Sequence, residues 1–389
     1  MKIYNFDELV NRQDTNCVKY DGRLQFFGNN DVLPLWVADM DFKTPDFITE
    51  AVQLRAQHAI YGYTFRPDSY NNAIIHWLKT RHNWEIQKEW IHFSPGVVPA
   101  LAMSVMCFTE PGDSVIVQPP VYFPFFSAVK NSDRELIENP LKLQNGRYFM
   151  DFEDLEKKIQ ADTKMLLLCN PHNPGGMAWT KKELQKLGEI CIANNIIVVS
   201  DEIHSDLIFK GHRHIPFASV SEEFAMNSIT CMAPSKTFNI AGLSTSFMVM
   251  PNKKIFDKYD NLMKGTHLYG GNIFGSVALE AAYTKGSDWL DQMMNYVEGN
   301  YDFMEQFLKE NIPLIIPMRP EATYLVWLDF SALRLKDADI NSRLIKAGVG
   351  LNRGVQFGRQ GKGFMRLNIG CPRSILEEAL ERMKKEFAE

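Results

Sequence analysis

The sequence predicts an α/β protein, with a large domain built on a mostly parallel sheet and a smaller α+β domain after it. Between about residues 90 and 250, short apolar runs alternate with helical segments, which is the order of strand–helix–strand units. The apolar runs are nearly continuous, as expected of strands that helices cover on both faces. In the last third, strand and helix candidates follow in a different order.

Five apolar runs are predicted to be strands of the large domain. They are Ser114–Val117, Met165–Cys169, Ile196–Ser200, Ser228–Met232 and Phe247–Met250. Between the second and third runs, Thr180 and Glu183 have the spacing of a capping box, so a helix is expected from there to Asn194. The apolar-rich stretch Pro99–Phe108 is also expected to be helical.

The last third predicts the smaller domain. Strands are expected at Ala322–Phe330, near Gly350 and at Phe364–Ile369, with a helix around Asn341–Ala347. A final helix is expected to start at Ser374, with Glu377 completing a second capping box. The first forty residues show no strong periodicity. We expect them to pack across the other domain or against a partner chain.

Composition and charge exclude several classes of protein. The chain has 389 residues, enough for two or three domains of about 150 residues each. It carries 42 Lys and Arg against 47 Asp and Glu, a net charge of −5, and 45% of its residues are hydrophobic. This balance argues against intrinsic disorder. It also argues against a nucleic-acid partner, because no basic excess exists to neutralise phosphates.

The sequence lacks the signals of a membrane or secreted protein. No apolar run approaches the roughly eighteen residues of a membrane-spanning helix, and the first ten residues include Asp7 and Glu8. Six dispersed cysteines without a C-x-x-C pair are typical of buried free thiols in a reducing compartment. We therefore expect a cytoplasmic protein with no membrane partner. His212 and His214 are too few ligands for a metal site, so no metal is expected.

Asn173 lies in a proline- and glycine-rich loop directly after the predicted strand Met165–Cys169. Pro171 and Pro174 stiffen this loop. Ligands bind at the carboxyl ends of strands in open α/β sheets. A binding role for Asn173 is therefore favoured over an ordinary turn.

Asp201 follows the next predicted strand, and His204 comes three residues later. An acid at the end of a buried strand needs a partner, and a protonated heterocyclic nitrogen would serve. Capping of a following helix is a strong alternative for Asp201. His204 reaches the same site if the segment turns helically. A satisfied structural histidine fits the pattern about as well.

Lys236 follows the predicted strand Ser228–Met232 among small and apolar residues. Partial desolvation would lower its pKa and give a nucleophilic amine. An exposed loop lysine is the alternative. Upstream, Gly96, Val97 and Val98 precede a helix whose first N–H groups could bind a phosphate. Taken alone, that motif is more often an ordinary turn.

Together these residues indicate a site for pyridoxal 5′-phosphate (PLP). This cofactor requires a donor to its ring oxygen, a carboxylate for its ring nitrogen and a lysine for its aldehyde. Asn173, Asp201 and Lys236 supply these groups after three successive strands. Gly96 to Val98 would supply the phosphate cradle.

The chain resembles fold-type I PLP enzymes over nearly its whole length. Within them it is similar to the MalY/PatB family of cystathionine β-lyases, close to class I/II aminotransferases. The shared motifs are Leu35-Trp-Val-Ala-Asp-Met-Asp-Phe42, Tyr61-Gly-Tyr-Thr64, Pro119-Pro-Val-Tyr-Phe-Pro124, Asn170 to Gly175, Asp201-Glu-Ile-His204, Ser235-Lys-Thr-Phe-Asn239 and Arg366-Leu-Asn-Ile-Gly370. The resemblance implies a seven-stranded sheet in a large PLP-binding domain of residues 45–285. Residues 1–44 and 286–389 would form the small domain with the N-terminal segment.

The resemblance also assigns roles residue by residue. Lys236 would bind PLP covalently and act as the catalytic residue, with Asp201 on the pyridine nitrogen and Asn173 on the ring 3′-oxygen. Arg366 would bind the substrate α-carboxylate as a bidentate guanidinium, and a surface salt bridge is its alternative. The other implied cofactor contacts are Gly96, Val97, Val98, Tyr122, His204, Ser235 and, from a second copy of the chain, Tyr61. The implied substrate contacts are Trp36, Ala38, Asp39, Asn173 and Arg366.

Aromatic packing in the core is the alternative for Tyr122 and Tyr61, and anchoring of the N-terminal segment is the alternative for Trp36. Three positions depart from the common aminotransferase pattern. His204, Ala233 and Ser244 stand where many members carry tyrosine, serine and arginine. Ser235 could replace one of the missing phosphate contacts.

Three functions are compatible with these residues. The family resemblance implies a β-lyase that cleaves cystathionine and related cysteine S-conjugates, with a small-molecule amino acid as substrate. An aminotransferase would use the same lysine and the same electron sink. The third is a regulatory protein that keeps PLP but acts on a transcription factor as its partner. The resemblance to fold-type I enzymes also implies a homodimer with a shared active site.

Overall fold

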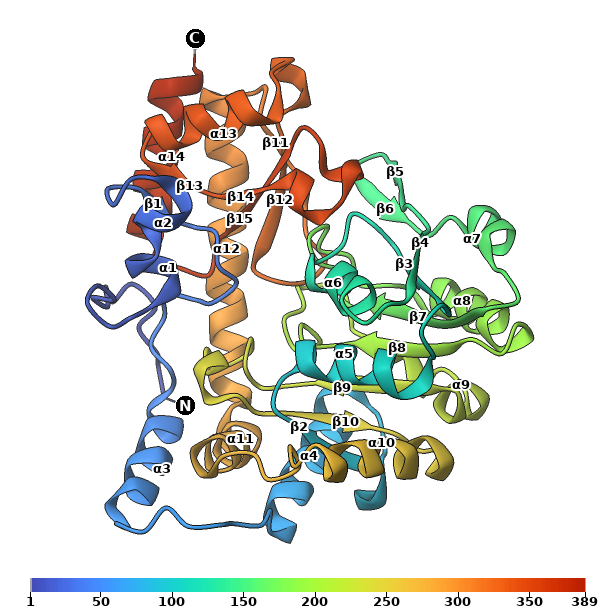
Figure 1. Ribbon diagram of the computed structural model, residues 1–389. Coiled ribbons are helices and arrows are strands. Elements are labelled where there is room, and N and C mark those ends of the chain that lie inside the picture. The colour runs from blue at the N-terminus through green and yellow to red at the C-terminus, as the bar shows by residue number, and fades with distance from the viewer. Residues whose placement is uncertain (1, 389) are drawn as a thin grey trace.

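The computed structural model describes residues 2–388, and its central feature is a seven-stranded sheet (Figure 1). In spatial order the strands are β2 (Ile91–Ser94), β10 (Ser246–Val249), β9 (Ser228–Met232), β8 (Ile197–Asp201), β7 (Thr163–Cys169), β3 (Ser114–Val117) and β4 (Glu135–Glu138). β3, β4, β7, β8 and β9 pair in parallel, whereas β10 is antiparallel to both β9 and β2. The predicted fold class, with a mostly parallel seven-stranded sheet, is confirmed.

Helices cover both faces of this sheet, which explains why its strands are apolar almost throughout. One face carries α5 (Val97–Phe108), α6 (Pro124–Lys130) and α10 (Lys253–Gly265), and the other carries α7 (Phe152–Lys158), α8 (Lys181–Ala193) and α9 (Glu222–Met226). Val115 and Val117 of β3 face the first core, and Ile116 faces the second. The predicted capping box of α8 is confirmed, with Glu183 N donating to Thr180 Oγ1 at 3.3 Å.

A second, four-stranded antiparallel sheet forms in the last third of the chain. Its order is β11 (Ile316–Pro317), β12 (Leu325–Asp329), β15 (Phe364–Asn368) and β14 (Asn352–Arg353). α12 (Ser287–Asn311), α13 (Asp337–Lys346) and α14 (Arg373–Phe387) share an apolar core with this sheet. A separate hairpin is formed by β5 (Lys142–Gln144) and β6 (Arg147–Phe149).

The second predicted capping box is wrong. α14 begins at Arg373, one residue before Ser374, and no side chain caps it. Contacts with α12 fix this start instead. Arg373 N donates to Tyr296 Oη at 2.7 Å, and Arg373 Nε donates to Asn300 Oδ1 at 2.8 Å.

The N-terminal segment packs against the C-terminal part of the same chain (Figure 1). It contains α1 (Val18–Asp21), α2 (Arg23–Phe27) and β1 (Leu33–Pro34), and β1 pairs in parallel with β13 (Val349–Gly350). Leu35 and Met40 join the core beneath the small sheet. Next come α3 (Asp46–Gln57) and α4 (Asp68–His82), which both pack against α11 (Ile273–Lys285).

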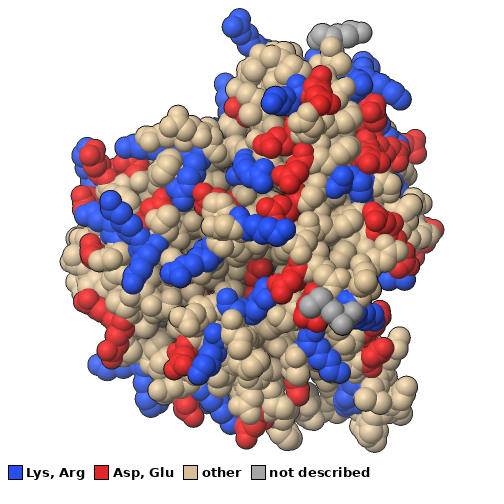
Figure 2. All heavy atoms as spheres, turned by 180° about the vertical axis from the view of Figure 1, so that it is seen from behind, with Lys and Arg blue, Asp and Glu red and all other residues tan. Residues whose placement is uncertain are grey.

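Charges of both signs are mixed on one face of the molecule, and the thiols are unpaired. Lys and Arg are interspersed with Asp and Glu over the face drawn in Figure 2. The six cysteines are free, and all except the half-buried Cys17 are buried. Among residues 2–388, no helix is long and apolar enough to span a membrane.

Candidate active site

Three neighbouring strands of the central sheet end at one cavity. β7, β8 and β9 are adjacent, and Asn173, Asp201 and Lys236 lie at or just beyond their carboxyl ends. The cavity has a volume of about 180 Å³. The predicted site residues that line it are Ala38, Gly96, Val97, Val98, Tyr122, Asn173, Asp201, His204, Ser235 and Lys236. Residues far apart in the sequence therefore meet at one place.

The predicted phosphate cradle lies at the N-terminus of α5. The backbone of Gly96 is extended, with φ 169°, a conformation that any residue can adopt. Glycine is favoured here by lack of space, because a Cβ would lie 3.2 Å from Pro99 Cδ. No side chain caps α5, so its first N–H groups remain available to a ligand. Thr245 also lines the cavity, and its buried Oγ1 has no partner among the described residues. These donors fit a phosphate group.

Hydrogen bonds fix the loop that carries Asn173. Trp179 Nε1 donates to Cys169 O at 2.8 Å, and the His172 ring contacts Pro120 O at 2.8 Å through Nε2. Asn173 Oδ1 accepts from Arg366 Nη1 at 2.9 Å. Because the amide oxygen is engaged, the Asn173 NH₂ group can donate to a bound molecule.

Asp201 is buried and has only a backbone partner. Ile203 N donates to its Oδ1 at 3.1 Å. Burial raises the pKa of the Asp201 carboxyl to about 7, although the Ile203 N–H opposes this shift. The predicted alternative of a helix cap is not seen, since turns rather than an α-helix follow Asp201. A cationic partner would stabilise the ionised form of this carboxylate.

His204 is buried at the cavity wall, with its ring edge-on to Tyr324 at a centroid distance of 6.2 Å. Burial, together with the charges of Lys236 and Arg366, lowers the pKa of His204 to about 3. The ring is therefore neutral near pH 7. Its Nδ1 is buried and has no partner within residues 2–388. A neutral imidazole can donate to or accept from a bound molecule.

Lys236 is a buried lysine rather than an exposed one. Its Nζ donates to Ala38 O at 2.7 Å. Burial lowers the pKa of the Lys236 amine to about 8, against the opposing charge of Asp39. The unprotonated fraction of the amine near neutral pH is thus larger than that of an exposed lysine, which favours its action as a nucleophile or base. Thr237 fixes the loop by donating to the buried Asp206 Oδ2 at 2.8 Å.

Arg366 lies on β15 and is buried beside Asn173. Its Nη2 donates to Asn352 Oδ1 at 2.7 Å and to Trp36 O at 3.0 Å, and its guanidinium lies 4.8 Å from the Phe357 ring centroid. No carboxylate pairs with it among the described residues, so a surface salt bridge is excluded. Its buried Nε has no partner there. The group is therefore arranged to receive a carboxylate from a bound molecule.

Four predicted site residues do not line the cavity in this chain: Arg366, which lies beside it against Asn173, and Trp36, Asp39 and Tyr61. Trp36 packs against Phe26 and Phe27 at the edge of the site. Asp39 has both carboxylate oxygens bound by Arg12. Tyr61 is 58% exposed, and its hydroxyl donates to Ala56 O at 2.8 Å.

The sequence reasoning missed several residues that contact the predicted site. They are Arg12, Lys19, Asp41, Asn239, Thr245, Tyr324, Asn352 and Asn368. One signal was present. Asp39 and Asp41 interrupt an apolar run, and buried acids require cationic partners elsewhere in the chain.

Comparison with known proteins places this geometry in a family. Residues 30–383 match the model of the family described as aminotransferase class I and II. The chain is 48% identical over 382 residues to cystathionine beta-lyase PatB of Bacillus subtilis (strain 168), covering 98% of this chain and 99% of the relative. It is 32% identical over 383 residues to protein MalY of Escherichia coli (strain K12), covering 97% of each. The structure of cystalysin from Treponema denticola, which contains a pyridoxal 5′-phosphate cofactor, has a TM-score of 0.96 and 38% identity over 99% of both chains. This chain therefore belongs to the aminotransferase class I and II family, and within it to the MalY/PatB group.

Proposed function

We propose that this protein is a PLP-dependent carbon–sulfur β-lyase. It would cleave L-cystathionine and related cysteine S-conjugates by α,β-elimination to a thiol (homocysteine from cystathionine), pyruvate and ammonia. The observation that carries the proposal is the meeting of the Lys236 amine, the Asp201 carboxylate and the unpaired side of Arg366. The name cystathionine beta-lyase, which the relatives in Bacillus subtilis and Corynebacterium glutamicum carry, supports the lyase reaction over transamination.

The residues around the cavity fit PLP. Asp201 is a buried carboxylate without a cation of its own, as a protonated ring nitrogen requires. The N-terminus of α5 and the Thr245 hydroxyl offer donors to a phosphate, and Tyr122 lines the cavity where a ring could stack on it. When bound and protonated on its ring nitrogen, PLP takes up the electron pair left at Cα when the substrate loses its proton.

The side chains around the cavity would have separate roles in the reaction. Lys236 would hold the cofactor aldehyde covalently until the substrate amine replaces it, and would then remove the Cα proton. Arg366 would bind the substrate carboxylate and so set the direction of the Cα–H bond toward Lys236. Asp201 would keep the ring nitrogen protonated. His204, which is neutral, could donate to the ring oxygen beside Asn173, and Ser235 is a further candidate for the phosphate.

The reaction is tested by incubating the PLP-loaded protein with cystathionine, cysteine and methionine separately. A lyase releases pyruvate and ammonia from the first two, with homocysteine from cystathionine and hydrogen sulfide from cysteine. It releases none of these from methionine, which has no leaving group on its β-carbon. An aminotransferase instead forms a keto acid, with glutamate from 2-oxoglutarate and no ammonia. Failure to release pyruvate or thiol from any cysteine S-conjugate would exclude the lyase. Binding to a transcription factor without turnover would then favour a regulatory role.

We also propose the domain division and the location of the protein. Residues 45–285 would form the large PLP-binding domain, and residues 1–44 with 286–389 the small one. The segregation of the two larger sheets supports this division. The free thiols support a reducing, cytoplasmic location.

We propose further that the protein is a homodimer whose active sites each use both chains. Exposed apolar side chains lie close together in sequence at the end of α3 and between α3 and α4, which is unusual for a monomer surface. They are Leu54, Ile60, Tyr61, Tyr63 and Phe65. A second copy would cover them, and Tyr61 would then reach the partner's phosphate site.

A mixture of two inactive variants tests the shared site. Tyr61→Ala and Lys236→Ala chains are each expected to form weakly active or inactive homodimers. Unfolded and refolded together, they should regain lyase activity, because one site of each heterodimer has both residues intact. Phe65→Ala mixed with Lys236→Ala controls for general surface effects. Absence of recovery in verified heterodimers would show that each chain completes its own site.

A further inference from the structure

Residues 36–41, here called the strap, cross the active site without regular secondary structure between β1 and α3. Side chains from other parts of the chain bind its carbonyl groups one after another. The contacts are Arg366 to Trp36 O, Asn368 to Val37 O, Lys236 and Tyr324 to Ala38 O, Asn368 and Lys19 to Asp39 O, and Asn239 and Arg12 to Met40 O. The strap is therefore held by side chains instead of by a sheet.

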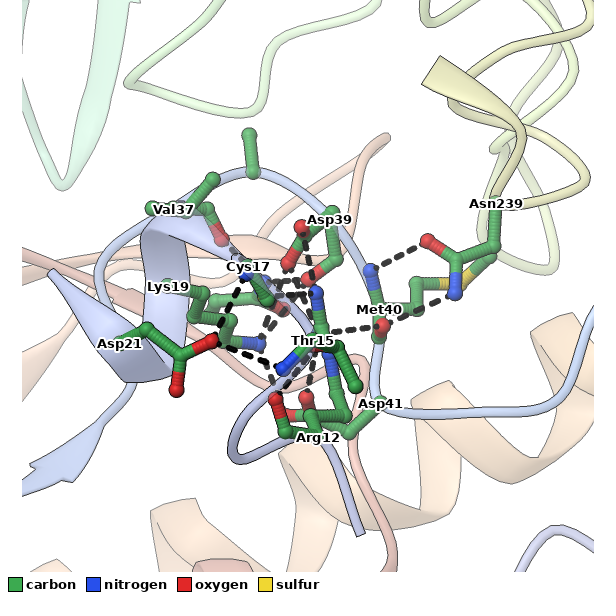
Figure 3. A network of polar contacts seen from close by, with 12 residues as sticks. Arg12, Thr15, Cys17, Lys19, Asp21, Val37, Asp39, Met40, Asp41 and Asn239 are labelled. Atoms are coloured by element: carbon green, nitrogen blue, oxygen red, sulfur yellow. Dashed lines mark hydrogen bonds and ion pairs between the residues drawn. The ribbon is translucent and has the colours of Figure 1, made fainter. Parts of the chain in front are cut away.

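Arg12 and Lys19 hold the strap through two of its own carboxylates, those of Asp39 and Asp41. We call these four residues the N-terminal clamp. Arg12 Nη2 lies 2.8 Å from Asp39 Oδ2, and Arg12 Nη1 lies 2.7 Å from Asp41 Oδ1. Lys19 Nζ lies 2.7 Å from Asp41 Oδ2 and 3.0 Å from Asp39 O. Figure 3 shows this network, with Asn239 contacting Met40 from the opposite side.

The clamp is electrically balanced and buried on one side, where Lys19 and Asp41 lie, whereas Arg12 and Asp39 are partly exposed. The side chain of Lys19 is 0% exposed and that of Asp41 is 3% exposed. Two cations compensate two carboxylates, which is the condition under which charges can be buried at tolerable cost. Burial opposes the ionisation of Asp39, but the hydrogen bond from Arg12 and the charges of Lys19 and Arg12 outweigh it, so the pKa of Asp39 lies below its ordinary value. Asp39 is thus ionised, and its carboxylate is paired with the cations of the clamp.

The carbonyl group that contacts Lys236 belongs to the residue next to the clamp in the sequence. Ala38 O, which accepts from Lys236 Nζ at 2.7 Å, belongs to the residue directly before Asp39. When the neutral amine donates one N–H to this carbonyl, its rotation about the Cε–Nζ bond is fixed, and its lone pair is restricted to one of two directions. The lone pair of Lys236 must face the Cα proton during transfer, and small misplacements at this stage are costly.

We propose that the N-terminal clamp positions the Ala38 carbonyl so that it orients the free Lys236 amine for proton transfer, which makes Arg12 and Lys19 positioning residues. The proposal rests on the proposed role of Lys236 as the base. It extends the function to residues that lie outside the cavity and touch neither substrate nor cofactor.

The test compares Arg12→Met and Arg12→Lys holoenzymes with the wild type. The proton transfer itself is measured as exchange of the Cα hydrogen of L-alanine in D₂O, a reaction common to lyases and aminotransferases. Arg12→Met should slow the exchange at saturating alanine on the order of ten- to a hundredfold, with little change in KM or bound PLP. Arg12→Lys should give an intermediate rate, because an ammonium keeps the charge but cannot bridge both carboxylates.

Amide hydrogen exchange of the holoprotein supplies a readout apart from turnover. The Met40 and Asp41 N–H groups donate to Asn239 Oδ1 at 3.0 Å and to Gly370 O at 2.8 Å. Both amides should exchange faster in the two Arg12 variants. Arg343→Met is the matched control, because Arg343 pairs with Glu386 at 2.9 Å between α13 and α14, in the part of the small domain outside the clamp. It should leave both readouts unchanged.

The pH dependence of the alanine exchange rate distinguishes a positioning role of Arg12 from an effect of its charge on Lys236. The charged or titratable groups that face Lys236 are Asp39, Asp201, His204, Tyr324 and Arg366. Because Arg12→Lys keeps the net charge of the clamp, its rate should stay low at every pH. Recovery of the wild-type rate at another pH would overturn positioning, as would a wild-type rate in Arg12→Met. Loss of lyase products with an intact alanine exchange would instead reject the proposed function alone.

Discussion

Replacing Lys236 by alanine is expected to abolish turnover while leaving a folded protein. The change removes the covalent anchor and the proposed base together, and loss of a general base alone costs roughly 10²- to 10⁴-fold in rate. The fold should survive because burial lowers the pKa of this amine to about 8, so at pH 7 its protonated form opposes folding. Ala38 O keeps its bond from Tyr324.

Pyruvate release from cystathionine measures the loss, and thermal unfolding of the cofactor-free variant measures the fold. Lys210→Ala, at an exposed site in the loop after β8, is the control and should keep full activity. Added ethylamine should restore part of the proton transfer to Lys236→Ala by occupying the vacated space. A variant that turns over at the wild-type rate would remove Lys236 from the mechanism.

Replacing Asp201 by asparagine should lower kcat by roughly 10²- to 10⁴-fold, since breaking a buried ion pair costs about 3–5 kcal/mol. The amide cannot keep a ring nitrogen protonated, so the electron sink is lost. The cofactor-free protein should respond in the opposite way. Burial raises the pKa of Asp201 to about 7, so its ionised form disfavours folding as pH rises above the ordinary carboxyl range. Above pH 7, Asp201→Asn should be at least as stable as the wild type.

The neighbouring buried acid provides a matched control for Asp201. Glu202 accepts from Ser200 Oγ at 2.8 Å and from Phe217 N at 2.9 Å, and it lies 2.7 Å from His214 Nε2. These partners show that Glu202 serves the fold. Glu202→Gln should therefore reduce the unfolding temperature but keep kcat per bound PLP. Equal losses of kcat in both variants would mean that Asp201 acts only through packing.

The parts of the fold that the sequence predicted are those buried on both faces. β3 and β9 have the predicted bounds because every residue in them is apolar or small and enclosed. β4 was missed because it is an edge strand with Glu135 and Glu138 at its ends and a half-exposed pattern. β2 was missed because His92 interrupts a short run, and its pairing with β10 depends on residues far away in the sequence. Local patterns do not encode such partners.

The same distinction applies to the candidate site. Asn173, Asp201 and Lys236 could be singled out because each directly follows a strand that the sequence marks clearly. The N-terminal clamp could not, because Arg12 and Lys19 lie in aperiodic sequence and meet Asp39 and Asp41 only through tertiary structure. Tyr61 remains a prediction, since its proposed role depends on a second chain.

The parallel pairing of β1 with β13 has a consequence for how the protein is made. Leu33 pairs with Val349. The first strand to leave the ribosome therefore cannot pair until one of the last strands has been synthesised. Until then, residues that later enclose the lysine have no docking surface, and the emerging polypeptide exposes Leu35 and Met40 to solvent and to chaperones. Chains truncated before residue 349 could still form the central sheet, but they would lack the wall that closes the catalytic chamber.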